Sequence, residues 1–173
     1  MTKLWDQIRT PNRSTPFEKA FLHTVFVACL GLALGVLAKL LDIYTTNLGN
    51  LFSQMSVWIF LCTLLAIYSS TPKRAAVNVF IFCSGMIAAY YATAIASKSI
   101  YSPLFAYGWT IFSFFSPVFA MCVWYAKGTG WIAKIISAGI IAVMLLIALF
   151  LFDKIRLSDV VFSVLIGILL LKK

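Results

Sequence analysis

Six stretches of apolar residues, separated by short polar segments, constrain the fold of this chain more than any other feature of its sequence. The stretches cover residues 17–42, 51–70, 73–97, 103–126, 131–152 and 157–171. A helix that crosses a bilayer needs about 20 mostly apolar residues, within a range of about 17–25. The first five stretches meet this requirement, and the sequence therefore predicts an all-α integral membrane protein.

The sixth stretch is shorter than the others. Its apolar part, VVFSVLIGILLL, has 12 residues before Lys172. It spans a bilayer only if Leu157 and the aliphatic part of Arg156 extend it, with the guanidinium reaching the interface. We expect a bundle of six transmembrane helices, with five spans plus a partly inserted C-terminal helix as the alternative. Residues 1–15 are expected to form a cytoplasmic leader, and residues 16–173 a single transmembrane helical domain.

The composition indicates that lipid is the solvent for most of the chain. Hydrophobic residues make up 62% of the sequence and charged residues only 11%, whereas soluble domains are about 45–50% apolar. The net charge is +9, but the basic residues lie mainly between apolar stretches, as topology signals and contacts for anionic lipid head groups do. We therefore expect the lipid bilayer, and not nucleic acid, as the partner of these charges.

The distribution of lysine and arginine predicts an orientation. If the spans alternate, one side of the membrane receives ten of these residues, which are Lys3, Arg9, Arg13, Lys19, Lys73, Arg74, Lys127, Lys134, Lys172 and Lys173. The other side receives four, which are Lys39, Lys98, Lys154 and Arg156. Because basic residues favour the cytoplasmic side, we expect a multi-pass protein of the cell membrane with both termini in the cytoplasm.

Several helix starts are visible in the sequence. A hydroxyl residue precedes proline at Thr15-Pro16, Thr71-Pro72 and Ser102-Pro103. This order is typical of an N-cap followed by the first helical residue. Glu18 completes a capping box with Thr15, and Ser158 is expected to cap the last helix in the same way.

Residues that carry most enzyme chemistry are sparse. The acidic residues all lie in termini, loops or helix ends, and they are Asp6, Glu18, Asp42, Asp153 and Asp159. A single histidine, His23, and four cysteines without a CxxC pair do not make a metal or redox motif. We expect the cysteines to be small, buried thiols. The sequence predicts no enzyme activity, no catalytic residue, no metal and no cofactor.

Two patterns inside the apolar stretches concern helix packing. Gly31 and Gly35 lie about one helical turn apart. This spacing permits close approach of another helix, which is either a helix of this chain or one of a docked partner. Pro117 removes a backbone donor and frees the carbonyl of Ser113. We expect a helix kink there, at which Ser113 and Ser116 help to satisfy the backbone.

A cluster of polar and aromatic residues follows the first apolar stretch, on the side predicted to face outward. Its members are Lys39, Asp42, Asn47, Asn50, Gln54 and Trp58, together with Tyr91, Tyr101 and Trp109 from the next outward-facing junction. Aromatic walls with a few convergent polar groups suit a small planar solute. The cluster is therefore predicted to bind substrate, with a solvated loop and an ordinary aromatic belt as the alternative.

Lys39 and Asp42 raise a separate question, because they lie three residues apart and share a helix face. Lys39 is about one helical turn from the predicted boundary, so its ammonium is expected to reach water. The pair either faces the lipid head groups or turns inward beneath Asn47, Asn50 and Trp58. The inward arrangement makes this segment one wall of the predicted binding site.

Three motifs carry a resemblance to a family of proteins. They are the N-L-G-N loop at 47–50, the T-P-K-R-A-A-x-N-V-F junction at 71–80 and the W-Y-A-K-G-x-G-W turn at 124–131. With these motifs the chain resembles an uncharacterised bacterial multi-span membrane-protein family, a domain of unknown function. The resemblance implies a membrane location and supplies no reaction.

The architecture also looks similar to the substrate-binding S components of energy-coupling factor transporters. That resemblance implies a small solute bound at the outer face, and docking on a transmembrane subunit that works with ATPase subunits. The first helix of S components usually carries an alanine-x-x-x-alanine element, where this chain has Gly31 and Gly35. The alternative is a non-enzymatic interaction protein, such as an accessory, assembly or immunity subunit without a transported ligand.

Overall fold

The fold is entirely helical in the part of the chain that the computed structural model describes, which is residues 7–12, 14–52, 54–152 and 155–172. The helices with defined bounds are α2 (Phe17–Tyr44), α3 (Thr46–Phe52), α4 (Met55–Ile67), α5 (Pro72–Ala96), α6 (Pro103–Ala126), α7 (Trp131–Phe152) and α8 (Leu157–Leu171). No strand occurs among the described residues. The predicted all-α class is confirmed.

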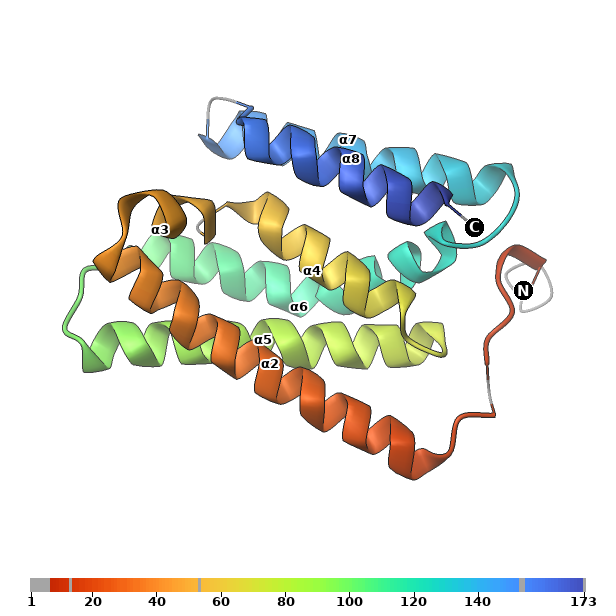
Figure 1. Ribbon diagram of the computed structural model, residues 1–173, viewed down its shortest axis with the longest axis horizontal. Coiled ribbons are helices and arrows are strands. Elements are labelled where there is room, and N and C mark those ends of the chain that lie inside the picture. Colours follow the sequence, from red (N-terminus) through yellow and green to blue (C-terminus); the bar gives the residue numbers. More distant parts are fainter. Residues whose placement is uncertain (1–6, 13, 53, 153–154, 173) are drawn as a thin grey trace.

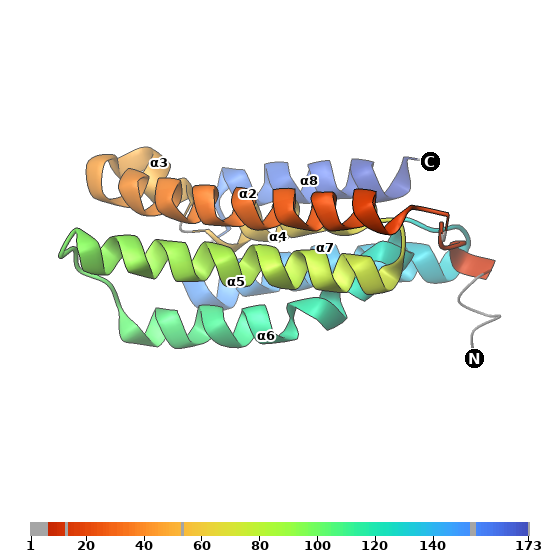
Figure 2. The ribbon, with the colours of Figure 1, turned by 90° about the horizontal axis from the view of Figure 1, so that it is seen from below.

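The helices other than α3 lie roughly along one direction and alternate in sense along the chain (Figure 1). At one end α2 and α5 finish and α6 begins, and we call it the Asp42 end. At the opposite end α4 and α6 finish and α5 begins, next to residues 7–12, and we call it the Arg9 end. Figure 2 shows the same helices after a turn of 90° about the horizontal axis. The alternation agrees with the order of directions expected from the sequence.

Not all of the helices are long enough to cross a bilayer alone. Among the described residues, α2, α5, α6 and α7 have the length and composition of membrane spans. The helices α3 and α4 pass the same test only as a pair, and they are bent by 54° relative to each other. With 15 residues, α8 is about 22 Å long, which is less than the hydrocarbon thickness of about 30 Å. The structure therefore supports a membrane-embedded helical bundle and does not confirm six spans.

The helix starts differ in part from the sequence prediction. Thr71 caps α5 as expected, because its hydroxyl accepts a hydrogen bond from the Arg74 N–H at 3.2 Å. The capping box predicted at Thr15 is wrong, since Pro16 is the N-cap residue of α2 and no side chain caps it. The cap predicted at Ser158 is also wrong. Asp159 accepts from the Arg156 N–H at 2.9 Å instead, so its carboxylate closes the first turn of α8.

The two predicted packing glycines lie where α2 crosses α5. A Cβ atom added at Gly31 would lie 2.6 Å from the carbonyl oxygen of Phe82, and one added at Gly35 would collide with that of Met86. Only glycine therefore permits this approach of the two backbones. This is the internal-packing alternative, and the face with both glycines is covered by α5 rather than open to a partner.

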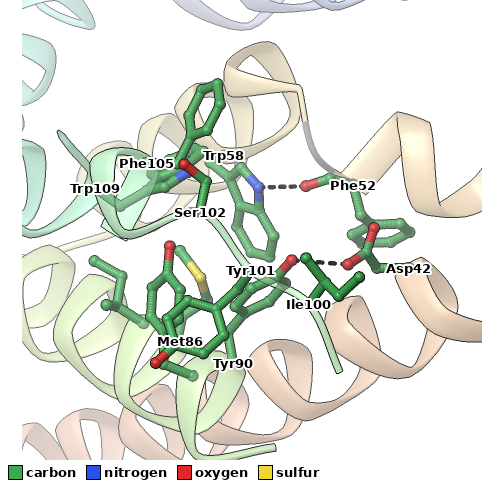
Figure 3. A pocket seen from close by; sticks show the side chains of 12 residues that line it. Asp42, Phe52, Trp58, Met86, Tyr90, Ile100, Tyr101, Ser102, Phe105 and Trp109 are labelled. Carbon is green, nitrogen blue, oxygen red and sulfur yellow. Dashed lines mark hydrogen bonds between the residues drawn. The ribbon is translucent and has the colours of Figure 1, made fainter. Parts of the chain in front are cut away.

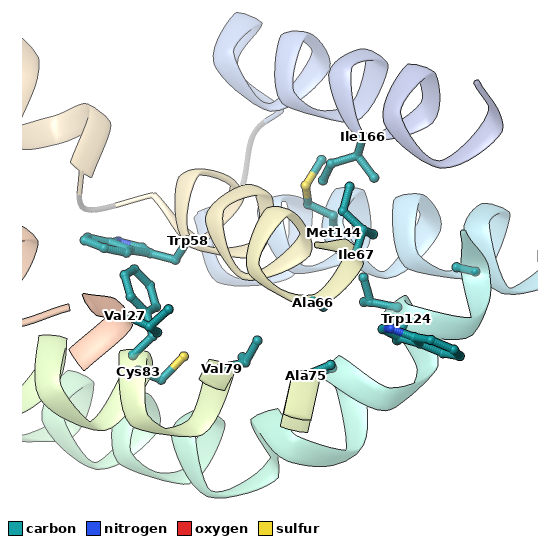
Figure 4. Packing of buried hydrophobic residues seen from close by; sticks show 14 of the residues in the cluster. Val27, Trp58, Ala66, Ile67, Ala75, Val79, Cys83, Trp124, Met144 and Ile166 are labelled. Atoms are coloured by element: carbon teal, nitrogen blue, oxygen red, sulfur yellow. The ribbon is translucent and has the colours of Figure 1, made fainter. Parts of the chain in front are cut away.

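The core is built around α4, which contacts α5, α6, α7 and α8. Trp124 is almost fully buried, and its indole N–H donates to the carbonyl of Ser69 just after α4, at 2.8 Å. On the other side of α4, Ile67 lies close to Met144 of α7 and Ile166 of α8 (Figure 4). The shortest of the apolar helices thus packs against four longer ones.

The kink predicted in α6 has the hydrogen bonds that it needs. Pro117 lies inside the helix, and the carbonyl of Ser113 accepts from the hydroxyl of Ser116 at 2.7 Å. The hydroxyl of Ser113 lies 3.1 Å from that of Ser84 on α5. The helix changes direction along its course in Figure 2. A serine of the same helix thus satisfies the carbonyl that proline leaves free.

At the Arg9 end, residues 7–12 hold the ends of two helices together. The guanidinium of Arg9 donates to the carbonyl of Ile67 at 2.7 Å and to that of Trp124 at 2.9 Å. It also lies over the Trp124 ring, 4.2 Å from the ring centroid. Because the carbonyls at a helix C-terminus attract positive charge, Arg9 stabilises the C-terminal ends of α4 and α6 at once.

Candidate functional site

A pocket of about 330 Å³ opens at the Asp42 end, between α2, α3, α4, α5 and the start of α6. We call it the aromatic pocket. Its lining residues are Asp42, Phe52, Trp58, Met86, Ile87, Tyr90, Tyr91, Ile100, Tyr101, Ser102, Phe105 and Trp109. Figure 3 shows that these side chains come from separate segments of the chain and surround one space.

An ion pair joins the wall of this pocket to the interior of the bundle. The ammonium of Lys39 lies 2.8 Å from Oδ2 of Asp42 and donates to the carbonyl of Ile100 at 3.2 Å. The hydroxyl of Tyr90 donates to the same carboxylate oxygen at 3.1 Å. Lys39 is 1% exposed, whereas the side chain of Asp42 is 35% exposed. The cation is therefore buried and the anion reaches the surface.

This arrangement corrects the expectation that the Lys39 ammonium reaches water. It also shows whether the Lys39–Asp42 pair faces the lipid head groups or turns inward. The ammonium of Lys39 does not reach water, because α5 and the segment before α6 cover it. The pair turns inward, as in the second alternative, but toward Ile100 and Tyr90 rather than beneath Asn47 and Asn50. A buried cation needs a close anion and further hydrogen bonds, and Asp42 and the Ile100 carbonyl supply them.

The walls of the pocket are aromatic rings in mutual contact. Tyr91 touches Tyr90 and Tyr101 edge to face, with centroid distances of 5.1 and 5.5 Å. On the opposite wall the indole N–H of Trp58 donates to the carbonyl of Phe52 at 2.7 Å, and the two rings meet edge on (Figure 3). Edge-to-face contacts are favourable geometries for aromatic pairs, so these contacts stabilise the walls of the pocket.

The predicted site residues divide into two groups. Five of the nine line the pocket, and they are Asp42, Trp58, Tyr91, Tyr101 and Trp109. Lys39 lies behind them, bonded to Asp42. Asn47 and Asn50 are exposed and do not line the pocket. Gln54 is buried on another side, where its amide oxygen accepts from Ser158 of α8.

Several lining residues were not predicted from the sequence. Ile87 lies four residues before Tyr91, and Met86 lies four residues before Tyr90, so these lining residues form two neighbouring rows on α5. The 3.6-residue period of a helix could have added Ile87 once Tyr91 was chosen, but not Tyr90 or Met86. Phe52 and Phe105 carry no such signal, since an aromatic residue at the end of an apolar stretch is common in membrane proteins.

Other potential chemistry is limited in the described part of the chain. No group of three or more His, Cys, Asp or Glu side chains that could hold a metal ion occurs among the residues searched there. Cys29 and Cys122 are exposed on the surface of the bundle, which corrects the expectation that all the cysteines are buried. The sulfur atoms of Cys62 and Cys83 lie 3.5 Å apart, as two thiols in contact.

One comparison with known proteins agrees with the predicted resemblance to an uncharacterised family. No curated protein and no solved structure matches the chain. One protein-family model, described as "Family of unknown function (DUF6518)", matches residues 14–171. Because this match covers nearly the whole chain, the protein belongs to that uncharacterised family.

Proposed function

We propose that this protein binds a small planar solute in the aromatic pocket and serves as a membrane transport subunit similar to the S components of energy-coupling factor transporters. The observation that carries the proposal is the pocket itself, which is lined by seven aromatic rings and the carboxylate of Asp42. Ligand sites are typically concave and mostly apolar, with few polar groups, and have volumes of about 300–1,000 Å³. The volume of about 330 Å³ suits a molecule of one or two fused rings.

The hydrogen-bonding groups at the pocket further restrict the solute. Lys39 neutralises Asp42, so the pocket offers little net charge to a ligand. Both described hydrogen bonds to the Asp42 carboxylate arrive at Oδ2. A neutral solute with an N–H or O–H group at its edge matches this carboxylate, and its ring faces match the tyrosines and tryptophans. A ring-containing vitamin or nucleobase-like compound has this chemistry.

The orientation that we propose follows from the charges. Seven of the ten lysine and arginine residues that the structure describes lie toward the Arg9 end, and the positive-inside rule assigns this end to the cytoplasm of a cell. The aromatic pocket then faces outward, toward solutes outside the cell membrane. A transmembrane subunit and ATPase subunits would drive uptake. Because α5 covers Gly31 and Gly35, such a partner contacts other lipid-facing surfaces of the bundle.

Ligand binding is tested on the full chain purified in a mild detergent. Native mass spectrometry reports a retained solute and any associated subunit, and tryptophan fluorescence reports titration with a panel of planar solutes. Replacement of a central aromatic anchor typically costs 2 kcal/mol or more, so we expect Trp109→Leu to weaken binding at least about tenfold.

The matched control is Trp131→Leu, because Trp131 is an exposed tryptophan at the Arg9 end. This variant should leave the affinity unchanged. The proposal fails if the purified protein retains no solute, binds none of the panel and brings no ATPase subunit with it.

A second candidate is a non-enzymatic interaction protein, such as an accessory, assembly or immunity subunit. One observation favours it, namely that Lys39 and Asp42 satisfy each other without a ligand. A stable complex with a protein unrelated to transport, with no solute retained by either protein, would support this candidate over the first.

A further inference from the structure

The indole N–H of Trp109 is a hydrogen-bond donor that the described part of the chain does not use. Trp109 lines the aromatic pocket and is half-buried. A tryptophan in such a position usually finds an acceptor, and the N–H groups of Trp58 and Trp124 donate to backbone carbonyls at 2.7 and 2.8 Å. Trp109 makes only a ring contact, with Phe112, and no hydrogen bond to any described residue.

The Trp109 nitrogen can be reached by a ligand. Two polar side-chain atoms in the described part of the chain are fully enclosed and have no partner, and they are the hydroxyl oxygens of Ser56 and Thr63. The Trp109 nitrogen is not one of them, so it keeps accessible surface although its side chain is half-buried. A solute in the pocket can therefore accept this hydrogen bond.

A second free donor lies on the same wall of the pocket. Ser102, Phe105 and Trp109 are three and four residues apart, so they share one face at the start of α6. Figure 3 shows Ser102 and Trp109 on the same side of the pocket. Ser102 is the N-cap residue of α6, but its hydroxyl caps no backbone N–H. This wall therefore offers donors to a solute.

The α2 side of the pocket makes the opposite requirement. Asp42 lies on a different side of the pocket from Trp109 (Figure 3). Its Oδ2 accepts from Lys39 and Tyr90, and its side chain is 35% exposed. A carboxylate only accepts hydrogen bonds, whereas an indole N–H only donates them. A solute that satisfies both residues must bring a donor to Asp42 and an acceptor to Trp109.

The other polar groups of the pocket do not impose this order. Tyr91 and Tyr101 line it as well, and a phenolic hydroxyl can either donate or accept. These two tyrosines therefore tolerate either kind of group on a solute. Asp42 and Trp109, each limited to one role, decide which edge of the solute faces which wall.

We propose that the aromatic pocket selects a planar heterocycle that has a ring N–H on one edge and a carbonyl on the opposite edge. The N–H donates to Asp42, and the carbonyl accepts from Trp109, with the Ser102 hydroxyl on the same wall. This inference rests on the solute binding proposed above and narrows the class of solute. A ring with a donor alone binds less tightly, because the Trp109 N–H then loses water without gaining an acceptor.

Four planar probes separate the two requirements. Quinolin-4-one has an N–H and a carbonyl on opposite edges, and its N-methyl derivative keeps only the carbonyl. Indole keeps only the N–H, and N-methylindole has neither group. Equilibrium dialysis with the full chain in lipid nanodiscs measures the four affinities, after binding to empty nanodiscs is subtracted. We expect quinolin-4-one to bind most tightly, with a loss of up to about tenfold for each missing group.

A substitution at Trp109 assigns the carbonyl to its N–H. Trp109→Phe keeps a ring and removes the donor, so the ratio of the quinolin-4-one affinity to the indole affinity should fall by up to about tenfold. The matched control is Phe105→Leu on the same wall. Phe105 has no donor, so this variant should weaken all four probes by a similar factor and leave the ratio unchanged.

Three results would overturn this inference. They are indole binding as tightly as quinolin-4-one, an unchanged affinity ratio in Trp109→Phe, and no binding of any of the four probes. The first two leave the proposed solute binding intact, because a planar solute is still bound. The third contradicts solute binding itself only if the purified protein also retains no solute and no ATPase subunit. If Trp109→Phe does not fold, the four affinities of the unsubstituted protein decide.

Discussion

Lys39 shows how a single charge can be held inside an apolar bundle. Its ammonium is almost inaccessible to solvent, and it contacts one carboxylate, one carbonyl and the face of Tyr90, whose ring centroid is 5.2 Å away. Asp42, in contrast, reaches the surface through the aromatic pocket. Removal of Asp42 would therefore leave a buried charge without a partner, whereas removal of Lys39 would leave a charge that reaches the surface.

This difference predicts unequal effects of two substitutions. Asp42→Asn leaves a buried ammonium without an anion, and we expect it to lower the free energy of unfolding by about 3 kcal/mol. Lys39→Met leaves a carboxylate that water and Tyr90 can still reach, so its cost should be about 1 kcal/mol. The same Lys39→Met change should weaken solute binding, because Asp42 loses the group that holds it in place.

Thermal unfolding in detergent measures both stabilities. The double variant Lys39→Met with Asp42→Asn is the internal control, because it removes both charges and should be more stable than Asp42→Asn alone. If Asp42→Asn and Lys39→Met are equally stable, the burial of the cation is not what distinguishes the pair.

At the scale of elements, the contact between α2 and α5 depends on missing side chains. We expect Gly31→Ala to destabilise the protein by roughly 1–3 kcal/mol, because the new methyl group meets the backbone of Phe82, which cannot move aside cheaply. Gly85→Ala is the matched control on α5. Its Cβ would lie 3.7 Å from the nearest atoms, which is ordinary contact.

Both variants can be compared by their melting temperatures and by their size-exclusion profiles in detergent. A Gly85→Ala protein as unstable as Gly31→Ala would mean that any added methyl group disturbs these helices. The close approach at Gly31 would then not explain the effect.

At the Arg9 end, Arg9 joins the C-terminal ends of α4 and α6 through its two hydrogen bonds. Burial lowers the pKa of the Arg9 guanidinium from its usual value, yet arginine remains charged throughout the neutral range. We expect Arg9→Ala to cost about 2 kcal/mol. Arg9→Lys should recover only part of this, because one ammonium cannot bond both carbonyls and also lie flat on Trp124.

Thermal unfolding and limited proteolysis of the segment before α2 measure the effect of the two Arg9 substitutions. Lys73→Ala is the control, since Lys73 is an exposed cation at the same end of the bundle. Full recovery by Arg9→Lys would show that charge alone, and not the fork of the guanidinium, holds the two helix ends.

For the whole molecule, the orientation in the membrane is the main prediction. In a cysteine-free background, Ile100→Cys should react with a membrane-impermeant maleimide in intact cells, because its side chain is 95% exposed at the Asp42 end. Ser14→Cys, exposed near the Arg9 end, should react only after the membrane is permeabilised. The positive-inside rule is the physical basis for this difference.

Lys172→Cys extends the same experiment to the C-terminal end of α8. With an even number of crossings, residue 172 lies on the same side of the membrane as residue 14. Labelling of Lys172→Cys from outside would instead favour an odd number of crossings. This result bears directly on α4 and α8, the two short apolar helices whose crossing the helix lengths alone leave unconfirmed.

Much of the candidate site could be anticipated because polar and aromatic residues gather at the ends of apolar stretches. Trp58, Tyr91 and Trp109 line one pocket, as the sequence predicted. Because consecutive helices alternate in direction, the ends that carry these residues lie on the same side of the bundle. Gln54 and Asn47 belong to the same end and still point elsewhere. Their direction depends on the bend between α3 and α4, which no residue spacing indicates.

The sequence by itself determined the helical membrane class, the order of the helices and their alternating directions. These features depend on hydrophobicity and length, which are properties of each segment alone. Only the tertiary structure decided which faces of the helices meet, and so where Lys39, Tyr90 and Gln54 lie. When a helix is apolar on nearly every side, no polar face marks the surface that will be buried. The choice is then made by small residues such as Gly31 and by the few hydrogen bonds between helices.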